Sequence, residues 1–349
     1  MSDFDPNAAA PRDAGIFGLP FAASESALVL LPVPWEATTS YGGGTSEGPS
    51  AIFEASHQVD LYDLDVHDLY KPGIAMLDEC EQIVSWNSTA REAALRVIEA
   101  QGEPPTASLA KDLALVNALS EKLNARVLEL SRAQLIAGKL LGVVGGDHSI
   151  PFGALQAIAE QHPSFGVLHI DAHSDTRSAY EGFAHSHASI MHNVLTHIPQ
   201  VAKLVQVGIR DVCAQEIAFC NDQGARVVMH TDRSLQHARF SGALWKNTAQ
   251  AIVAALPAKV WISFDIDGLD PRFCPHTGTP VPGGLDYSEA VYLLLEVVRQ
   301  GKTIVGFDLN EVAPSTDPMN EWDANVGARL LYKLCGAMLA SHGLAKLAD

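Results

Sequence analysis

The sequence predicts an α/β fold: a single three-layer α/β/α domain with a central parallel sheet. Short aliphatic or β-branched segments alternate with longer amphipathic segments, as strands and crossover helices do in a parallel sheet that is covered on both faces. No internal repeat and no linker rich in proline, glycine and serine divides the chain. We therefore expect residues 21–349 to form one domain, preceded by a flexible arm of residues 1–20.

Seven segments have the apolar character of buried strands. They are residues 27–32, 141–144, 166–170, 204–207, 226–229, 260–264 and 303–307. Six amphipathic segments are predicted to be mainly helical. They are residues 107–138, 152–161, 187–197, 242–255, 287–299 and 325–340. The first belongs to a long helical connection, 77–138, with a break at Gly102, Pro104 and Pro105. This connection is either a surface helix pair or a wall or lid that shapes access to a site.

Composition and charge narrow the functional classes. Apolar residues make up 47% of the chain and charged residues 18%, which is typical of a globular protein. The 23 Lys and Arg residues against 41 Asp and Glu residues give a net charge of −18, which disfavours nucleic acid and favours small cationic or neutral ligands. We expect no membrane partner, because no apolar run approaches the roughly 20 residues of a spanning helix. Five scattered cysteines and the lack of a signal-peptide pattern favour the cytoplasm.

Aspartate and histidine residues follow four of the predicted strands. The motifs are GGDHS at 145–149, DAHSD at 171–175 and DID at 265–267, and Glu311 follows the last strand. The carboxyl ends of parallel strands open on one edge of a sheet, and ligands bind there. We therefore expect these groups to meet at that edge.

The spacing within the motifs favours a metal site. Residues two apart in an extended chain point to the same side, so Asp171, His173 and Asp175 can converge. Asp265 and Asp267 can converge opposite them for the same reason. Buried carboxylates in such number would repel one another without a cation. Carboxylates with imidazoles suit Mn²⁺, and bridging carboxylates suggest two ions about 3.5–4 Å apart.

Together these motifs resemble the signature blocks of the ureohydrolase family, the arginase, agmatinase and formiminoglutamase group. The blocks are GGDHS at 145–149, DAHSD at 171–175 and SFDIDGLDP at 263–271. The resemblance extends from about Leu31 to Leu334, nearly the whole chain. It implies the arginase-like α/β/α fold that the strand and helix pattern also predicts.

The resemblance also implies the site residues. Two divalent ions, Mn²⁺ or alternatively Ni²⁺, would be held by His148, Asp171, His173, Asp175, Asp265 and Asp267. They would activate the water that attacks a guanidinium carbon, releasing urea and an amine. Glu311 would bind the guanidinium nitrogens, since a carboxylate matches that planar group with two hydrogen bonds. Asp175 is counted with Glu311 among the catalytic residues.

A histidine in the loop YEGFAHSHAS, residues 180–189, is the expected proton shuttle. Alignment with the family pattern favours His187, with Ala188 in place of the usual glycine, and leaves His185 as the alternative. An imidazole with a pKa near 6.5 suits acid–base work. In the competing interpretation both histidines lie on the surface, and Ser186 caps the following helix.

The sequence defines the substrate less closely. Arg177 stands where arginases usually carry an asparagine, which disfavours L-arginine. It either meets a substrate carboxylate or pairs with Glu181 or another acidic side chain. His276 replaces a usual glycine. Trp35 and Tyr41 could line the pocket, where a cation resting on either ring would gain on the order of 1 kcal/mol. Arg177, His276, Trp35 and Glu311 are thus the expected substrate-binding residues.

Several functions stay open at this point. The first is an agmatinase-like hydrolase, and its near equal is a hydrolase of free guanidine, alkylated guanidines or biguanides that uses Ni²⁺. A hydrolase of guanidino acids or formiminoglutamate is a third. A catalytically silent subunit and a one-zinc amide hydrolase like the histone deacetylases are disfavoured, because the full two-metal ligand set and Glu311 are present. Family members are commonly trimers or hexamers, so we expect a homo-oligomer, with a hetero-oligomer containing a homologue as the alternative.

Overall fold

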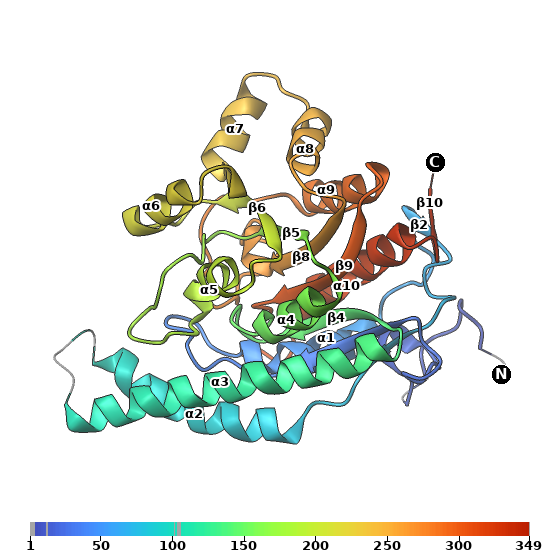
Figure 1. Ribbon diagram of the computed structural model, residues 1–349. Helices are drawn as coiled ribbons and strands as arrows, with labels where there is room; N and C mark the ends of the chain where they lie inside the picture. The colour runs from blue at the N-terminus through green and yellow to red at the C-terminus, as the bar shows by residue number, and fades with distance from the viewer. Residues whose placement is uncertain (1–3, 12, 101, 103–105, 349) are drawn as a thin grey trace.

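The computed structural model describes residues 4–11, 13–100, 102 and 106–348 (Figure 1). Its central feature is an eight-stranded sheet in the order β3-β1-β4-β9-β8-β5-β6-β7, in which every neighbouring pair is parallel. The strands are β1 (Leu28–Val33), β3 (Ile74–Met76), β4 (Leu140–Gly145), β5 (Phe165–Ile170), β6 (Val201–Ile209), β7 (Val227–Thr231), β8 (Lys259–Asp265) and β9 (Thr303–Asn310). Two-residue strands β2 (Val66–His67) and β10 (Lys346–Leu347) pair antiparallel beside it. The predicted fold class is confirmed.

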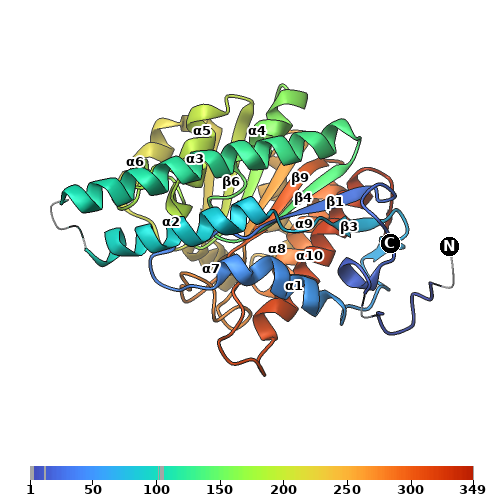
Figure 2. The same ribbon diagram turned by 90° about the horizontal axis from the view of Figure 1, so that it is seen from below.

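Helices cover both faces of the sheet (Figures 1 and 2). One core cluster lies under α1 (Gly48–Ser56), α7 (Asp232–Phe240), α8 (Trp245–Ala254), α9 (Tyr287–Arg299) and α10 (Trp322–Ser341). The other lies under α2 (Glu81–Glu99), α3 (Ala107–Ile136), α4 (Phe152–Gln161) and α5 (Ile190–His197), and Phe219 of α6 (Ala214–Asp222) packs against it.

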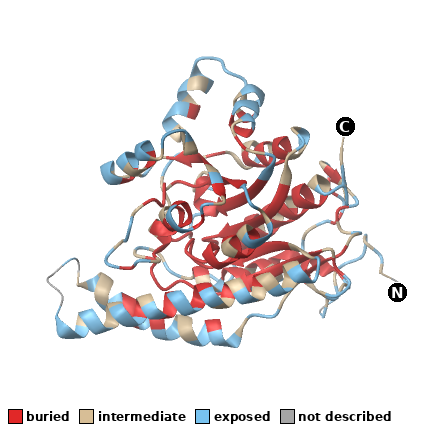
Figure 3. Cartoon of the chain, in the orientation of Figure 1, coloured by how far each residue is buried: buried red, intermediate tan, exposed pale blue. Residues whose placement is uncertain are grey.

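The strands read as continuous apolar runs because both of their faces are buried (Figure 3). Successive side chains point to opposite faces of a strand. In β1, Leu28 and Leu30 therefore enter the first cluster, whereas Leu31 and Val33 enter the second.

Several elements differ from the expectation. Strand β3 is only three residues long, and α1, α6 and α7 had no predicted counterpart. Leu235 is the only buried residue of α7, and the rest of its sequence is too polar to indicate a helix that packs on the core. The predicted helix at 187–197 begins with a 3-10 turn, His187–Ser189, before α5.

The long connection at 77–138 is an antiparallel helical hairpin of α2 and α3, which lie side by side across one face of the molecule (Figure 2). Gly102 adopts a φ of +76°, and Pro104 and Pro105 lie outside the described residues. The helical-pair part of the prediction is therefore confirmed.

The predicted N-terminal arm makes contacts with the domain. Ile16, Phe17 and Leu19 are buried in the first core cluster, and residues 1–3 and 12 lie outside the described part of the chain. The flexibility of residues 1–20 stays a prediction. In the described residues no helix has both the length and the apolar character to cross a membrane.

The order of the strands positions the functional motifs. Strands β4, β9, β8 and β5 are consecutive neighbours in the sheet. They are followed by GGDHS, Glu311, DID and DAHSD respectively. All four strands are parallel, so the motifs reach the same edge of the sheet side by side.

Candidate metal centre

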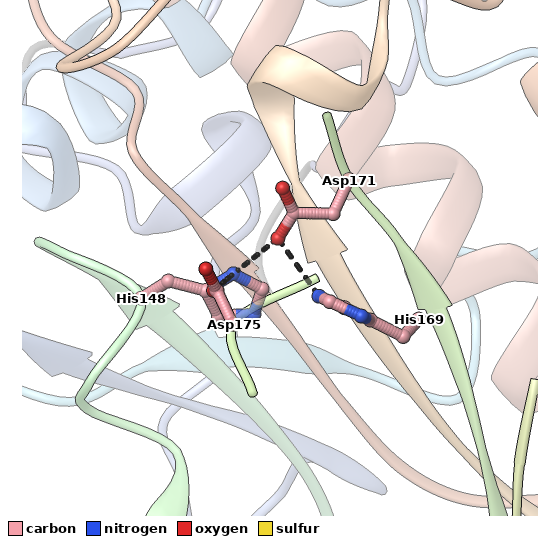
Figure 4. Close-up of side chains that lie close together, drawn as sticks. All are labelled: His148, His169, Asp171 and Asp175. Atoms are coloured by element: carbon pink, nitrogen blue, oxygen red, sulfur yellow. Dashed lines mark hydrogen bonds and ion pairs between the residues drawn. The ribbon is translucent and has the colours of Figure 1, made fainter. Parts of the chain in front are cut away.

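The first half of the site gathers around the imidazole of His148. Its Nδ1 lies 2.9 Å from Oδ2 of Asp171 and 3.4 Å from Oδ2 of Asp175 (Figure 4). His169 approaches the same Asp171 oxygen at 2.8 Å. These four residues are buried, and each offers a ligand atom within 4.8 Å of the others. Asp265 also belongs to this half of the site, because its Oδ2 lies 3.2 Å from His148 Nδ1.

The second half of the site shares Asp171 with the first. Asp171, His173 and Asp267 offer ligand atoms within 4.8 Å of one another. His173 Nδ1 lies 3.0 Å from Asp267 Oδ2 and 3.5 Å from Asp171 Oδ1. Asp171 thus presents one oxygen to each half. The structure brings together all six residues that the sequence assigned to metal.

Two carboxylates of the site sit on backbone in the left-handed region, which non-glycine residues rarely adopt. Asp175 has a φ of +54° and Glu311 a φ of +62°. The carbonyl of Asp175 accepts hydrogen bonds from the backbone N–H groups of Met191 and His192 at the start of α5. The N–H of Glu311 donates to Gly146 O at 2.8 Å. Tertiary hydrogen bonds therefore hold these unusual conformations.

The pKa values in this cluster are shifted because several acidic side chains lie close together and are shielded from water. Burial and the neighbouring Asp171 raise the pKa of Asp175 well above its usual range. Burial and Asp267 do the same to the pKa of Asp265. Burial opposes charge on His173 too, but Asp267 and Asp171 raise its pKa to about 12. Burial and mutual repulsion therefore disfavour the charged forms of Asp175 and Asp265.

These observations fit divalent metal ions. The donors are carboxylate oxygens and imidazole nitrogens, without a thiolate, which suits borderline-hard ions. A cation would offset the repulsion between the buried acids and stabilise their charged forms. Oε2 of Glu311 is buried at the same edge without a hydrogen-bond partner among the described residues, so the site also has an unused acceptor for a ligand.

Sequence reasoning missed the residues that orient the first half of the site. His169 precedes Asp171 by two positions on β5, and its Nδ1 lies 3.1 Å from Nε2 of Gln206. His148 Nε2 lies 2.8 Å from Ser263 Oγ, which donates to Asp308. The alternation of side chains along β5 was a usable signal for His169, whereas the partners on other strands depend on the sheet order.

A pocket of about 320 Å³ opens onto the second half of the site. Its lining includes His173, Asp175, Arg177, His187 and Asp211. His187, the favoured shuttle, lies in this wall, whereas His185 does not line the pocket and instead lies beside Phe152 at a ring-centroid distance of 5.6 Å. Burial, together with the nearby His173, lowers the pKa of His187 to about 3, so its imidazole is neutral here.

Two expected substrate-binding residues are not in this pocket. Trp35 is fully buried behind the GGDHS motif, and its backbone packs so closely on Gly146 that any Cβ there would lie 1.9 Å from Trp35 O. His276 bonds to Asp323 of α10, with its Nδ1 at 2.8 Å from Oδ2. The structure therefore gives no support to ligand contacts by Trp35 or His276 in this pocket, because core packing engages Trp35 and the hydrogen bond with Asp323 engages His276.

Arg177 and Tyr41 do line the pocket. The guanidinium of Arg177 lies over the ring of Tyr180 at 4.9 Å, and its Nε lies 3.6 Å from Oε2 of the buried Glu216. Arg177 thus has an acidic partner, as one of the two sequence interpretations held, although the partner is Glu216. Tyr41 is 85% exposed at the pocket.

Comparison with known proteins identifies the family. The family model described as Arginase family matches residues 26–336. The chain belongs to the arginase family. Family members are ureohydrolases that act on guanidino compounds and depend on two metal ions, so this protein is a hydrolase of amidino C–N bonds.

Individual relatives of this arginase-family chain have different printed activities. It is 31% identical to an N(1)-aminopropylagmatine ureohydrolase of Synechocystis over 90% of this chain and 89% of the relative. It is 32% identical to the proclavaminate amidinohydrolase of Streptomyces clavuligerus over 89% and 88% of the two chains. The solved structure of a Streptomyces clavuligerus proclavaminate amidinohydrolase superposes with a TM-score of 0.74 at 24% identity, covering 96% of this chain and all of that one, which shows the shared fold.

Glycine at position 278 is expected to be required for activity. A Cβ there would lie 2.7 Å from Glu311 Oε2 and 2.9 Å from Thr39 Cγ2, beside the free acceptor. We expect Gly278→Ala to lower kcat/KM for a guanidino substrate about 10-fold or more, because the methyl group displaces the carboxylate. Steady-state urea release measures this. Gly43→Ala is the control, since its Cβ would meet nothing closer than 3.7 Å; equal losses in both variants would contradict the prediction.

Proposed function

We propose that this protein is an agmatinase-like enzyme, which hydrolyses a guanidino compound with a cationic or neutral tail to urea and an amine. The observation that carries the proposal is the meeting of four strand-end motifs at one buried site, with the unpartnered carboxylate oxygen of Glu311 beside it. The family assignment supports the reaction class, and the pocket chemistry supports the choice of tail.

In this proposal the two ions are held by the six residues assigned from the sequence. His148, Asp171, Asp175 and Asp265 surround one position, because three carboxylates approach Nδ1 of the histidine within 3.4 Å. Asp171, His173 and Asp267 surround the other, and Asp265 is joined to them because its Oδ1 accepts the backbone N–H of Asp267 at 2.8 Å. When bound, the ions supply Lewis-acid chemistry and activate water at neutral pH. We propose Mn²⁺ as the ion, with Ni²⁺ as the alternative.

The remaining steps belong to side chains of the protein. Oε1 of Glu311 accepts the backbone N–H of His148 at 3.0 Å, which fixes the carboxylate. Its Oε2 is then free to accept N–H groups of a guanidinium. His187 lies in the pocket wall, and because burial and the nearby His173 lower its pKa to about 3, a proton held there is readily passed on to the departing nitrogen. Burial of both groups strengthens these contacts by excluding water.

The charges at the pocket favour a substrate without a carboxylate tail. The positive charge of Arg177 is shared with Glu216 and with the face of Tyr180. Asp211 is an exposed carboxylate in the same lining, and no ion pair involves it among the described residues. The net charge of −18 adds a field that attracts cations. An amine-terminated guanidine such as agmatine fits this arrangement better than a guanidino acid.

A substrate panel tests the proposal. The purified protein is loaded with Mn²⁺ or with Ni²⁺, and urea is measured with agmatine, N(1)-aminopropylagmatine, 4-guanidinobutyrate, arginine, formiminoglutamate, guanidine and dimethylbiguanide. We expect the amine-tailed guanidines to have the highest kcat/KM. Urea from guanidine or dimethylbiguanide alone would instead assign the small-guanidine branch. No urea from any compound with two ions bound would contradict the proposal and favour a silent subunit.

Asp211 provides a sharper test of the tail. We expect Asp211→Asn to raise KM for agmatine about 3- to 10-fold at low salt, with little change in kcat. The substitution removes the negative charge of an exposed carboxylate that would attract the amine of the substrate. The control is Asp222→Asn at the exposed end of α6, outside the pocket. An unchanged KM in Asp211→Asn would exclude Asp211 as the contact for the tail. The homo-oligomer and the cytoplasmic location stay predictions.

A further inference from the structure

The side chain of Thr38 joins the favoured proton shuttle to a buried carboxylate. Thr38 is fully buried, and its Oγ1 accepts the backbone N–H of His187 at 3.0 Å. The same oxygen lies 3.3 Å from His187 Nδ1 and 3.3 Å from Asp147 Oδ2. Asp147 also accepts the backbone N–H of Thr38 at 3.4 Å and the hydroxyl of Ser149. Asp147 is buried and has no role in the proposed chemistry.

The proton positions in this chain follow from what each group can donate. The single hydroxyl proton of Thr38 is donated to Asp147 Oδ2, so Thr38 Oγ1 has only lone pairs left for His187. The lone pairs of Thr38 Oγ1 then accept the amide and the Nδ1–H of His187. Ser186 Oγ is a more distant partner of Nδ1, at 3.4 Å. This arrangement selects the Nδ1–H tautomer and leaves Nε2 to exchange protons in the pocket.

The helix α2 holds the segment that carries Thr38. Arg91 Nη1 donates to Thr39 O at 2.5 Å and to Ala37 O at 3.4 Å, on both sides of Thr38. Asn87 Oδ1 accepts the N–H of Glu36 at 2.8 Å. The residues around Thr38 thus depend on polar side chains of α2 for their backbone hydrogen bonds.

The helix α3 holds the loop that carries His187. Asn117 Nδ2 donates to Gly182 O at 3.2 Å, and Asn117 Oδ1 accepts the N–H of Ala184 at 2.9 Å. Gly182 also packs on Leu113, since a Cβ there would lie 2.8 Å from Leu113 Cδ2. One hairpin therefore binds both segments whose contact is the Thr38–His187 hydrogen bond.

We propose that Thr38 is a positioning residue that fixes the orientation and tautomer of His187, and that the α2–α3 hairpin acts through it by holding both segments in place. The inference rests on the proposed function, in which His187 exchanges the proton with the leaving nitrogen. It also gives the long connection at 77–138 a role in the reaction while α2 and α3 stay outside the pocket lining.

The variants Thr38→Val and Thr38→Ser test the first part. Valine keeps the shape and removes the hydroxyl, so we expect kcat to fall about 10-fold or more while KM and the two bound ions stay unchanged. Serine keeps the hydroxyl and is expected to restore kcat to within about 3-fold of the parent. A kcat in Thr38→Val equal to that of the parent would overturn the proposal. Equal kcat losses in both variants, at equal thermal stability, would overturn it as well.

A measurement on the resting protein separates this inference from the proposed function. The N–H of His187 donates to Thr38 Oγ1, so Thr38→Val should speed its hydrogen exchange, and ¹⁵N NMR of the imidazole should show loss of the single Nδ1–H tautomer. Both readouts need no substrate. If the parent releases no urea but these changes occur, the proposed function fails and the positioning contact stands. Unchanged exchange and tautomer would remove the contact itself.

The variant Asn117→Ala tests the role of the hairpin. It removes both loop hydrogen bonds, so we expect faster hydrogen exchange across residues 180–187 and a lower kcat. Arg96→Ala is the matched control: Arg96 joins α2 to Asp112 of α3 at 2.9 Å, but it is not hydrogen-bonded to either loop. It should leave both readouts as in the parent. Identical effects of Asn117→Ala and Arg96→Ala would mean that the hairpin contributes only to the overall stability of the protein, which would overturn its assigned role.

Discussion

Replacing Asp267 with alanine is expected to lower kcat/KM for urea release by a factor on the order of 10³ or more. The reason is that the substitution removes a proposed metal ligand and the electrostatic catalysis that depends on it. Asp267 lies 3.0 Å from His173 and belongs to the second half of the site. Without its carboxylate, Asp171, whose Oδ1 lies 3.5 Å from His173 Nδ1, is the remaining acidic partner of that imidazole among the described residues. Bound metal, measured by inductively coupled plasma mass spectrometry after gel filtration, should fall from about two ions to about one.

The control for this variant is Asp270→Ala, three residues further along the same segment. Asp270 accepts the N–H of Arg272 and is not part of either ligand group. It should retain both ions and near-parental turnover. Unchanged turnover in Asp267→Ala would sink the two-metal assignment, and full loss of activity with two ions still bound would move Asp267 from a ligand to another role.

Replacing Glu311 with glutamine is expected to lower kcat/KM about 10²- to 10³-fold, because a charge-assisted contact with the guanidinium becomes a neutral one in a dry site. The amide oxygen can still accept the N–H of His148, which now donates to Oε1 at 3.0 Å. The fold and the metal content should therefore survive. Urea-release kinetics measure the loss of kcat/KM, and metal analysis of the same sample checks that both ions are still bound.

A second buried glutamate provides the comparison. Glu296 of α9 is 3% exposed and accepts a hydrogen bond from Gln300, and it belongs neither to the ligand groups nor to the pocket lining. Glu296→Gln should leave kcat/KM unchanged. If Glu311→Gln also kept parental kcat/KM, the substrate guanidinium would have to bind elsewhere in the pocket. Burial and the nearby Asp265 raise the pKa of Glu311 well above its usual range, which agrees with an acceptor that lacks its cationic partner.

The sequence carried the metal-site prediction because its signals are local. DAHSD places Asp171, His173 and Asp175 at spacings of two after an apolar strand, and GGDHS and DID follow the same rule. Parallel strands then bring such ends to one edge whatever their order. The helices α4 and α9 coincide with the predicted segments because each has one apolar face against the sheet.

The substrate-binding residues were harder to predict because each candidate side chain can contact another part of the protein instead of lining the pocket. Trp35 and His276 carry suitable chemistry, but a close backbone contact with Gly146 buries the first and Asp323 engages the second. Arg177 lines the pocket and pairs with Glu216, which is 39 residues further along the chain. A sequence pattern cannot indicate which of several acids lies beside an arginine.

The sequence alone determined the fold class, the reaction class and the residues proposed to hold metal, since periodicity and short spacings fix which side chains share an edge. Only the tertiary structure decided what orients them: His169 against Asp171, and Thr38 between Asp147 and His187. It also decided that α2 and α3 hold the loops of the site. These contacts join residues separated by tens of positions, and the packing of separate elements, rather than any local pattern, sets their geometry.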